Sequence, residues 1–306
     1  MKFFSKRIGL EIGLVFCTLF LLNITSVSAT KLIPSSAKQI KTDSTVRILA
    51  IGNSFSQDAL ENYLYGLAKA GGHKIIIGNL YIGGAELALH WTNASEDKNA
   101  YSYRRIGLNG EKVTRPETSI AFALAAENWD YVSFQQASPL SGLYDTYTVP
   151  LPALINYVKE RVKNPKTKYV LHQTWAYAQT TKHKGFANYE SNQNKMYKAI
   201  SKATEKVSKE NKMDLLVPSG TAVQNARTSF VGDSLNVADG YHLALMGRYA
   251  ASCTWYEKLF KESVIGNTFS PKGLSAYKTE MLQNAAHSAV LKPFKVTVLK
   301  KFKQAP

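Results

Sequence analysis

Cysteine is scarce in this chain, which has only Cys17 and Cys253 among its 306 residues. Cys17 lies in an amino-terminal apolar segment that we expect to be removed, so the remaining chain cannot form an intramolecular disulfide. Metal-ligand spacings such as His-Glu-x-x-His or a cysteine pair do not occur, and neither do Gly-x-Gly-x-x-Gly or a phosphate-binding loop. The sequence therefore predicts a protein without disulfides, without a metal and without a nucleotide cofactor.

Acidic residues are outnumbered, with 22 Asp and Glu against 38 Lys and Arg and a net charge of +16. The basic residues are spread over residues 163–168, 182–184 and 295–303, form no single basic helix, and accompany no nucleic-acid motif. This distribution is typical of a solvated surface, and we predict no nucleic-acid partner. Attraction to an acidic polysaccharide or an anionic envelope is the functional alternative.

The amino-terminal apolar run is too short to cross a bilayer, which needs roughly 20 apolar residues. The run covers residues 12–22, follows a basic start and precedes small residues at 27–29, which is the pattern of an export signal. We predict a signal peptide over residues 1–29, a flexible lead-in over residues 30–45 and a single domain over residues 46–306. The protein is then exported, either periplasmic or secreted, without stable membrane insertion, and no oligomeric state is predicted.

Strand and helix patterns alternate along the rest of the chain. Strand candidates cover residues 48–51, 74–81, 131–135, 169–171 and 215–217, and helix candidates cover residues 58–70, 119–127, 151–162, 189–210, 219–227, 243–260 and 277–291. Asn109-Gly110 predicts a hairpin that projects from the main sheet. Alternation at this spacing predicts an α/β fold with about five parallel strands and helices on both faces.

The first strand ends in a turn with the chemistry of a nucleophile site. Gly52-Asn53-Ser54 follows the apolar run and leads into a helix, so Ser54 lies at the carboxyl edge of the sheet, where ligands bind. The helix amino terminus adds unpaired N–H groups, which suit an anion. Ser54 can therefore act as a nucleophile beside a developing oxyanion. The alternative is that Asn53 and Ser54 only cap the helix.

A second stretch, Asp239-Gly240-Tyr241-His242, supplies the base that such a serine needs. Its carboxylate can bend back to the imidazole three residues later, fix the tautomer and stabilise the imidazolium. A serine hydroxyl is a poor nucleophile without such a base, so we expect Ser54 Oγ within about 3.5 Å of a His242 ring nitrogen. The alternative for His242 is a surface or capping role.

Three blocks now stand in one order: Gly52-Asn53-Ser54-Phe55, the glycine pair 83–84, and Asp239-x-x-His242. In this order they resemble the GDSL, or SGNH, hydrolase family, and the resemblance covers about residues 46–260. It implies a three-layer α/β/α, flavodoxin-like fold for an SGNH-hydrolase-like domain. It also implies a catalytic serine at the end of the first strand.

The resemblance assigns roles to individual residues. Ser54 would be the nucleophile, His242 the general base and Asp239 the carboxylate that orients it. The backbone N–H groups of Ser54 and Gly84 would face the oxyanion, with Gly83 as the near alternative. A glycine suits this role because it lets a substrate oxygen approach the amide.

Two departures separate the chain from the usual family pattern. Asn53 stands where the family has an aspartate, and Phe134-Gln135-Gln136 replaces the Gly-x-Asn-Asp block after the third strand. The replacement resembles sialate and acetylxylan esterase branches. A glutamine amide can donate the third oxyanion hydrogen bond, worth roughly 3 to 4 kcal/mol, and we assign this to Gln136 or, failing that, Gln135. The alternative is a strand-end residue that satisfies a neighbouring backbone group.

Other polar and aromatic side chains are candidates for substrate contact. Asn53 and Gln135 belong to this set, and so do His90 and Trp91, which follow the glycine pair, and Trp175, which follows the fourth strand. Aromatic faces at the ligand edge can stack on sugar rings, and the alternative for all three rings is packing beneath the cleft.

These expectations combine into an exported serine esterase whose substrate is an O-acylated, most specifically O-acetylated, carbohydrate or another small ester. A lipase or thioesterase of the same fold is the first alternative. A glycan-binding protein that has lost catalysis is the second.

Overall fold

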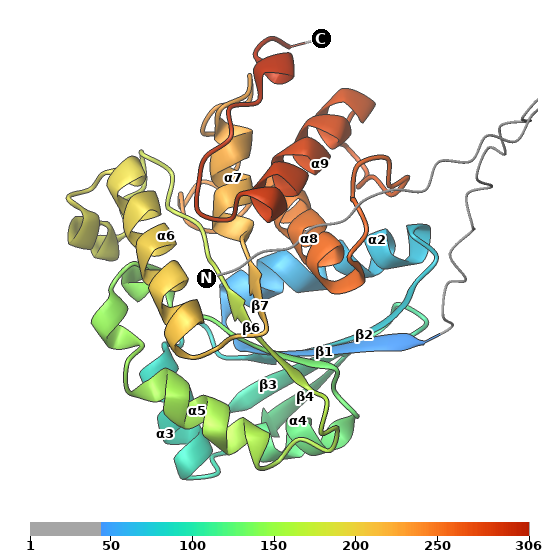
Figure 1. Cartoon of the computed structure of the whole chain (residues 1–306), viewed down its shortest axis with the longest axis vertical. Coiled ribbons are helices and arrows are strands. Elements are labelled where there is room, and N and C mark those ends of the chain that lie inside the picture. Colours follow the sequence, from blue (N-terminus) through green and yellow to red (C-terminus); the bar gives the residue numbers. More distant parts are fainter. Residues whose placement is uncertain (1–43, 306) are drawn as a thin grey trace, which may run out of the picture. The chain divides into compact units, whose positions relative to one another are not determined.

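The computed structural model describes residues 44–305, and a seven-stranded sheet runs through them (Figure 1). Five strands pair in parallel: β1 (Thr45–Gly52), β2 (Lys74–Tyr81), β5 (Tyr131–Phe134), β6 (Lys168–His172) and β7 (Leu215–Val217). Two more, β3 (Tyr101–Ile106) and β4 (Lys112–Thr118), form an antiparallel hairpin. The expectation of about five parallel strands is confirmed. The hairpin extends the sheet at β2 and does not project from it.

The strand order places a ligand crevice at the end of β1. The order is β4-β3-β2-β1-β5-β6-β7, so the chain winds outward from β1 in both directions. Counted in chain order, the parallel strands follow the 2-1-3-4-5 arrangement of flavodoxin-like folds. In such sheets the crevice opens between the first and third parallel strands, here β1 and β5, at their carboxyl ends. Ser54 lies two residues after the end of β1, and Gln135 directly follows β5.

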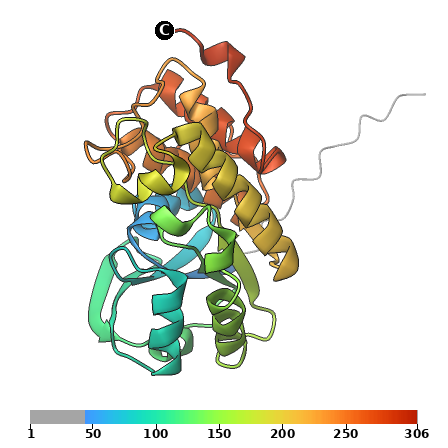
Figure 2. The ribbon, with the colours of Figure 1, turned by 90° about the vertical axis from the view of Figure 1, so that its left-hand side faces the viewer.

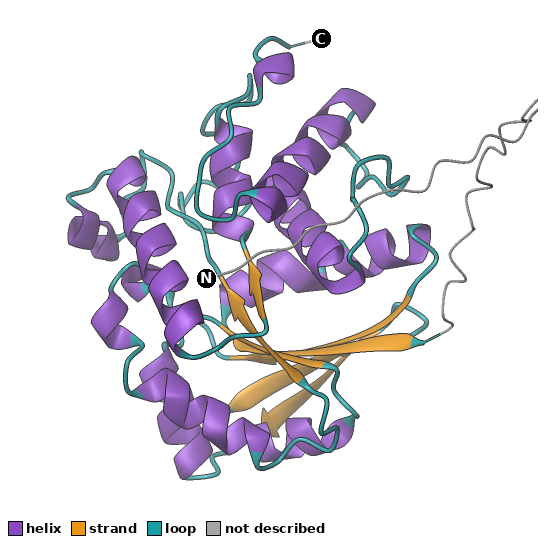
Figure 3. Ribbon diagram, in the orientation of Figure 1, coloured by secondary structure: helices purple, strands orange, loops and turns teal. Residues whose placement is uncertain are grey.

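Helices cover both faces of the sheet, which gives three layers (Figures 1 and 3). One face carries α2 (Leu64–Ala70), α6 (Gln193–Glu210), α7 (Ser219–Arg227), α8 (Leu245–Phe260) and α9 (Ala276–Leu291). The other face carries α3 (Leu87–Ser95), α4 (Ile120–Ala126) and α5 (Pro150–Lys159), and the view turned by 90° separates the two sets of helices (Figure 2). Of these helices, α3 was not predicted.

Alternate residues of β1 explain why both faces need cover. Ile48 and Ala50 belong to one buried apolar cluster, whereas Leu49 and Ile51 belong to the other. Successive side chains of a strand point to opposite faces, so a strand with no polar position must be buried on both sides. The unbroken apolar run 48–51 is the sequence form of this requirement.

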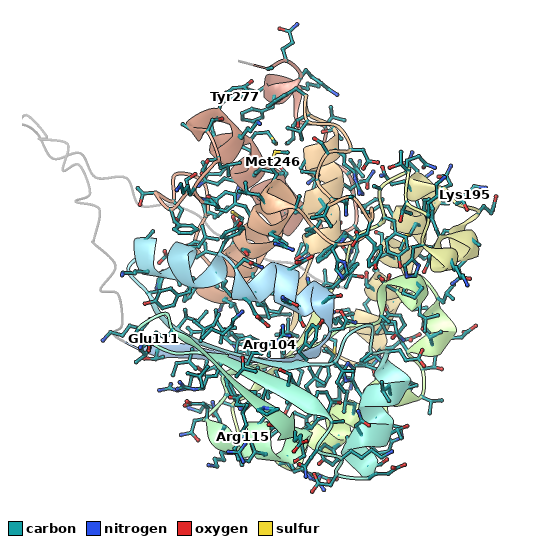
Figure 4. The ribbon with its side chains drawn as sticks, turned by 180° about the vertical axis from the view of Figure 1, so that it is seen from behind. Arg104, Glu111, Arg115, Lys195, Met246 and Tyr277 are labelled. Carbon is teal, nitrogen blue, oxygen red and sulfur yellow. The ribbon has the colours of Figure 1, made fainter. Side chains whose placement is uncertain are left out.

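The sheet ends in two protected edges. β4 is one edge, exposed from Lys112 to Glu117, and it contains Pro116. Arg115 on this strand is labelled in Figure 4. Its pairing with β3 shifts register between Tyr101 and Tyr103, which marks a β-bulge. The other edge, β7, is only three residues long.

The described residues all belong to one compact unit. Within residues 44–305, no helix is long and apolar enough to span a membrane. The predicted signal peptide and all but the last two residues of the predicted lead-in lie outside the described residues.

Candidate active site

The Ser54 turn is held by its neighbours on both sides. Asn53 has an extended backbone and caps the three-residue helix α1 (Ser54–Ser56), and its Oδ1 accepts a hydrogen bond of 2.9 Å from the Phe55 N–H. Gly52 is required at the strand end, because a Cβ there would lie 2.4 Å from Ser56 Oγ. The turn therefore requires glycine at position 52, followed by a residue such as Asn53 whose side chain can cap the helix.

A chain of buried hydrogen bonds connects this turn to the far strands. Gln135 Nε2 donates to Asn53 Oδ1 at 2.7 Å, and Asn53 Nδ2 donates to the Ala85 carbonyl at 2.9 Å. Since the Gln135 amide nitrogen donates, its Oε1 accepts from His172 Nδ1 at 2.9 Å. The remaining His172 nitrogen, Nε2, then accepts from the Ser219 hydroxyl at 3.1 Å. Each of these hydrogen bonds therefore has a defined donor and a defined acceptor.

This series of hydrogen bonds accounts for both Asn53 and Gln135, the residues at which the sequence departs from the usual family pattern. An aspartate at position 53 could accept from Gln135, but it could not donate to the Ala85 carbonyl. Burial lowers the pKa of His172 to about 3, so its imidazole stays neutral, as the chain requires. Asn53 and Gln135 are therefore matched residues that fix the Ser54 turn. Each is only 2% exposed, and both amides are engaged in this network of hydrogen bonds.

The loop before α8 holds the predicted base. His242 Nδ1 lies 2.7 Å from Asp239 Oδ2, and Asp239 Oδ1 accepts from the N–H groups of Tyr241 and His242 at 2.9 and 3.0 Å. Burial of the Asp239 carboxyl opposes its charge, but the hydrogen bonds from the Tyr241 N–H, the His242 ring and the His242 N–H outweigh burial and lower its pKa. The His242 side chain remains 29% exposed, so its Nε2 is the nitrogen left for a reacting group.

Trp175 joins the serine turn to the base loop. Its ring stacks on Phe55, with centroids 4.1 Å apart and planes within 7°, and its Nε1 donates to the Tyr241 carbonyl at 2.8 Å. Phe55 follows Ser54 and Tyr241 precedes His242, so one buried side chain touches the neighbour of each. Trp175 lies beneath the site, which corrects the expectation that it stacks on a sugar.

Asp58 makes a second connection between the same two segments. It lies in the π-helix η1 (Gln57–Glu61) and accepts from the Leu243 N–H at 2.8 Å and from Arg248 Nε at 2.7 Å. Burial raises the pKa of Asp58, although the Leu243 N–H and the Arg248 guanidinium oppose that rise. The predicted helix 58–70 is instead divided between η1 and α2, with a break at residues 62–63. Sequence reasoning did not single out Asp58.

The serine turn and the base loop meet at a cavity of about 270 Å³, which we call the central cavity. Its lining comes from five parts of the chain: Asn53, Tyr81, Gly83, Gly84, Ala137, Ser138, Pro139, His183, Tyr241 and His242. The rings of Phe55 and His242 lie 6.2 Å apart at the base of this junction. Within residues 44–305, the Ser54 hydroxyl makes no hydrogen bond to His242, so the expected direct contact is not formed. Catalytic hydrogen bonds are often long before substrate binds.

The glycine pair offers backbone donors to the central cavity. Gly84 has a φ of +67°, a left-handed conformation that favours glycine, and no atom lies within 4 Å of where its Cβ would be. Across the described residues, neither the Gly83 N–H nor the Gly84 N–H donates a hydrogen bond to the protein. Both N–H groups are therefore available to an oxyanion.

Gln136 does not serve as the third donor in this structure. Its Nε2 donates to the Thr146 carbonyl and hydroxyl at 3.1 and 3.0 Å, and its Oε1 accepts from the N–H groups of Leu87 and Ala137 at 2.9 and 2.8 Å. The side chain is 1% exposed. The prediction for Gln136 is wrong, and so is the fallback to Gln135, because both amides satisfy buried groups.

Two other residues expected at the cleft lie elsewhere. His90 is fully buried, its Nδ1 lies 2.9 Å from the Tyr101 hydroxyl, and burial lowers its pKa to about 3. Trp91 packs against the apolar cluster on the α3, α4 and α5 face. Both are packing residues, because α3 turns them away from the central cavity.

Tyr81, His183 and Tyr241 line the central cavity, although the sequence did not single them out. Each lies at or beyond the carboxyl end of a strand or in the base loop. That position in the sequence could have indicated that these residues line the site. Within the part of the chain that the structure describes, no three His, Cys, Asp or Glu side chains are placed to hold a metal ion.

Comparison with known proteins places the chain in a family. The sequence model of a domain of unknown function (DUF4886) matches residues 47–289. A crystal structure of a DUF4886 family protein from Bacteroides uniformis is 50% identical, with a TM-score of 0.83, over 85% of this chain and 100% of that one.

Two further solved structures are more distant. A putative SGNH hydrolase from Slackia heliotrinireducens is 22% identical, with a TM-score of 0.49, over 70% of this chain and 99% of that one. An acetylxylan esterase variant from Geobacillus stearothermophilus is 13% identical, with a TM-score of 0.47, over 71% and 96%. Among curated proteins none matches. The family model covers most of the chain, and the protein therefore belongs to the DUF4886 family.

Proposed function

We propose that the protein is a serine esterase with Ser54 as nucleophile, His242 as general base and Asp239 as the carboxylate that orients it. The observation that carries this proposal is the Asp239–His242 pair at 2.7 Å, at the same cavity as the Ser54 turn and the free N–H groups of Gly83 and Gly84. Base, nucleophile turn and oxyanion donors come from three segments and meet at the carboxyl ends of β1 and β2.

The reaction uses these groups in two halves. Ser54 Oγ attacks the ester carbonyl while His242 Nε2 takes its proton, and the proton then passes to the leaving alcohol. Water hydrolyses the acyl-enzyme by the same route. The developing oxyanion would accept from the Ser54 N–H and from Gly84 or Gly83. With both glutamine amides occupied, the site relies on backbone donors.

An O-acetylated carbohydrate is the substrate class that we propose, for a protein exported to the periplasm or beyond. The central cavity is small at about 270 Å³, and hydroxyl and imidazole groups of Tyr81, His183 and Tyr241 line it. This polar lining favours a sugar over a lipid as the bound part of the ester, and the octanoate ester in the test below examines the lipase and thioesterase alternatives. A glycan-binding protein without catalysis is the alternative, favoured by the missing Ser54–His242 hydrogen bond.

The test is hydrolysis of p-nitrophenyl acetate, p-nitrophenyl octanoate and acetylated xylan by wild type, Ser54→Ala and His242→Ala. Each substitution should lower kcat roughly 10³- to 10⁶-fold, because triad members act as a unit. Ser95→Ala, an exposed serine at the end of α3, is the matched control and should retain activity. Full activity in Ser54→Ala would end the proposal. Glycan binding without turnover by wild type would establish the binding alternative.

A further inference from the structure

Three cavities form a row with the central cavity in the middle. On one side lies a cavity of about 390 Å³ that shares Gly83, Gly84, Ala137 and Pro139 with it. We call this the apolar cavity, because Leu89, Pro139 and Leu140 line it, although Glu86 also lies in its lining. On the other side lies a cavity of about 480 Å³ that shares His183 with the central cavity. We call this the lysine cavity, because Lys182 and Lys184 line it.

His183 lies at the junction of the central and lysine cavities, and its Nδ1 is occupied as a hydrogen-bond acceptor. The Gly185 N–H donates to its Nδ1 at 3.0 Å, so in the neutral ring the proton is on Nε2. Burial lowers the pKa of His183 against the raising effect of the Asp239 charge, which favours that neutral ring. Within residues 44–305 no protein atom hydrogen-bonds Nε2. The His183 ring meets the Tyr241 ring edge-on at 4.9 Å, beside His242.

The lysine cavity carries uncompensated positive charge. Lys182 and Lys184 are exposed, and across the described residues neither forms an ion pair. Asp233, which contacts the lining residue Gln179, accepts from Arg227 at 2.8 Å and from the Gln179 N–H at 2.7 Å.

The other acids beside this cavity are also occupied. Glu190 pairs with Lys195, and Asp239 pairs with His242. An anion entering the lysine cavity would therefore meet two ammonium groups and no free carboxylate among the cavity's lining residues.

The direction of proton transfer decides which part of an ester lies where. His242 gives its proton to the leaving alcohol, so the alcohol lies on the side of His242 and His183. The carbonyl oxygen lies at the Gly83 and Gly84 N–H groups, so the acyl group extends toward the apolar cavity. The apolar and lysine cavities thus correspond to the two halves of one ester.

We propose that the lysine cavity binds the leaving alcohol, that this alcohol is a sugar bearing a carboxylate, and that the His183 Nε2–H donates to it. This inference rests on the proposed esterase function and names its substrate class. His183 is a specificity residue in this scheme. It would lie between the reacting oxygen and the anion held by Lys182 and Lys184.

The experiment compares an O-acetylated methyl glucuronoside with the matched O-acetylated methyl glucoside, which differ only in the carboxylate. Wild type should prefer the uronate by about 10-fold in kcat/KM, since two exposed lysines contribute modestly, and added salt should reduce the preference. Lys182→Gln/Lys184→Gln should bring the ratio close to one. His183→Asn should lower kcat/KM for both sugar esters, chiefly through KM.

The matched control is Lys163→Gln/Lys166→Gln, two exposed lysines before β6 and so near the opposite edge of the sheet. It should keep the uronate preference. A wild type without preference, or a preference that survives loss of Lys182 and Lys184, would overturn the inference. Hydrolysis of p-nitrophenyl acetate that depends on Ser54 separates this failure from failure of the esterase proposal, in which no ester is turned over.

Discussion

Single amide side chains determine the shape of the serine turn. Asn53 uses its oxygen for the Phe55 N–H and the Gln135 amide, and its nitrogen for the Ala85 carbonyl. Neighbouring Gln136 is used in the same way by backbone groups of two other segments, at Leu87 and Thr146, and by the N–H group of the adjacent Ala137. Buried amides with every partner satisfied rigidify a site, and removal of one leaves several groups unpaired.

Gln136→Ala should therefore destabilise the protein and spare its chemistry. It leaves the N–H groups of Leu87 and Ala137 and the Thr146 carbonyl without their partner, which should cost roughly 2 to 4 kcal/mol of unfolding free energy. The kcat of the folded fraction should change less than about three-fold. Urea denaturation and ester hydrolysis on one preparation measure both. A 100-fold lower kcat with unchanged stability would restore Gln136 as an oxyanion donor.

The residues that sequence could identify are those whose partners are close in the chain. Asp239 and His242 are three residues apart, so their contact follows from local geometry. The environment of Gln136 depends on Leu87 and Thr146, which lie in other elements, and no spacing rule reveals them. For the same reason Ser54 could be placed at a strand end, but its distance to His242 could not be foreseen.

At the scale of elements, Trp175 is what keeps two loops in one arrangement. The residue follows β6 in the chain, yet its contacts are with Phe55 after β1 and Tyr241 before α8. Small displacements of reacting groups can cost 100-fold in rate, so a residue that fixes their separation is a positioning residue.

Trp175→Phe should keep the stacking on Phe55 and lose the hydrogen bond to the Tyr241 carbonyl. We expect kcat to fall about 10-fold with little change in KM, because the base loop is displaced while the substrate cavities persist. Trp255→Phe is the matched control, since Trp255 is equally buried but its Nε1 has no hydrogen-bond partner in the described structure. Equal kcat losses in the two variants would show that Trp175 acts only through stability.

Elements were predicted best where apolar periodicity decides them. The five parallel strands and most of the helices that cover them follow from the sequence, in which short apolar runs alternate with segments of helical apolar spacing. The helix expected at residues 58–70 breaks because Asp58 and Glu61 face buried partners. Glu61 accepts from Asn79 at 2.7 Å and from Arg104 of the hairpin at 3.4 Å. Inward-facing carboxylates on a helix require contacts that periodicity does not contain.

At the scale of the whole molecule, two buried histidines make stability depend on pH. Burial lowers the pKa of His90 and of His172 to about 3, whereas an unfolded chain takes up these protons near pH 6.5. The contribution of these two histidines to the unfolding free energy is fully present above about pH 6.5 and is lost as pH falls toward 3. The lowered pKa of Asp239 adds a loss at more acid pH, and the raised pKa of Asp58 acts in the opposite direction.

His90→Phe isolates one of these protons. Between about pH 6 and pH 4, the unfolding free energy of wild type should fall with a slope that includes roughly 1.4 kcal/mol per pH unit from His90. The variant should lose that part of the slope, whatever its stability at pH 7. Urea denaturation at a series of pH values provides the comparison. Identical slopes would mean that His90 is protonated in the folded protein.

The edges of the sheet govern how copies of this protein meet at high concentration. An edge strand with a straight row of free N–H and C=O groups can recruit the edge of a second molecule, and continued recruitment builds fibrils. On β4, Pro116 has no N–H to offer, the bulge bends the row, and Lys112 and Arg115 would face like charges on a neighbour. At the other end, β7 presents three residues, too few for a lasting ladder. Both edges of the sheet are therefore poor templates for recruiting a further strand.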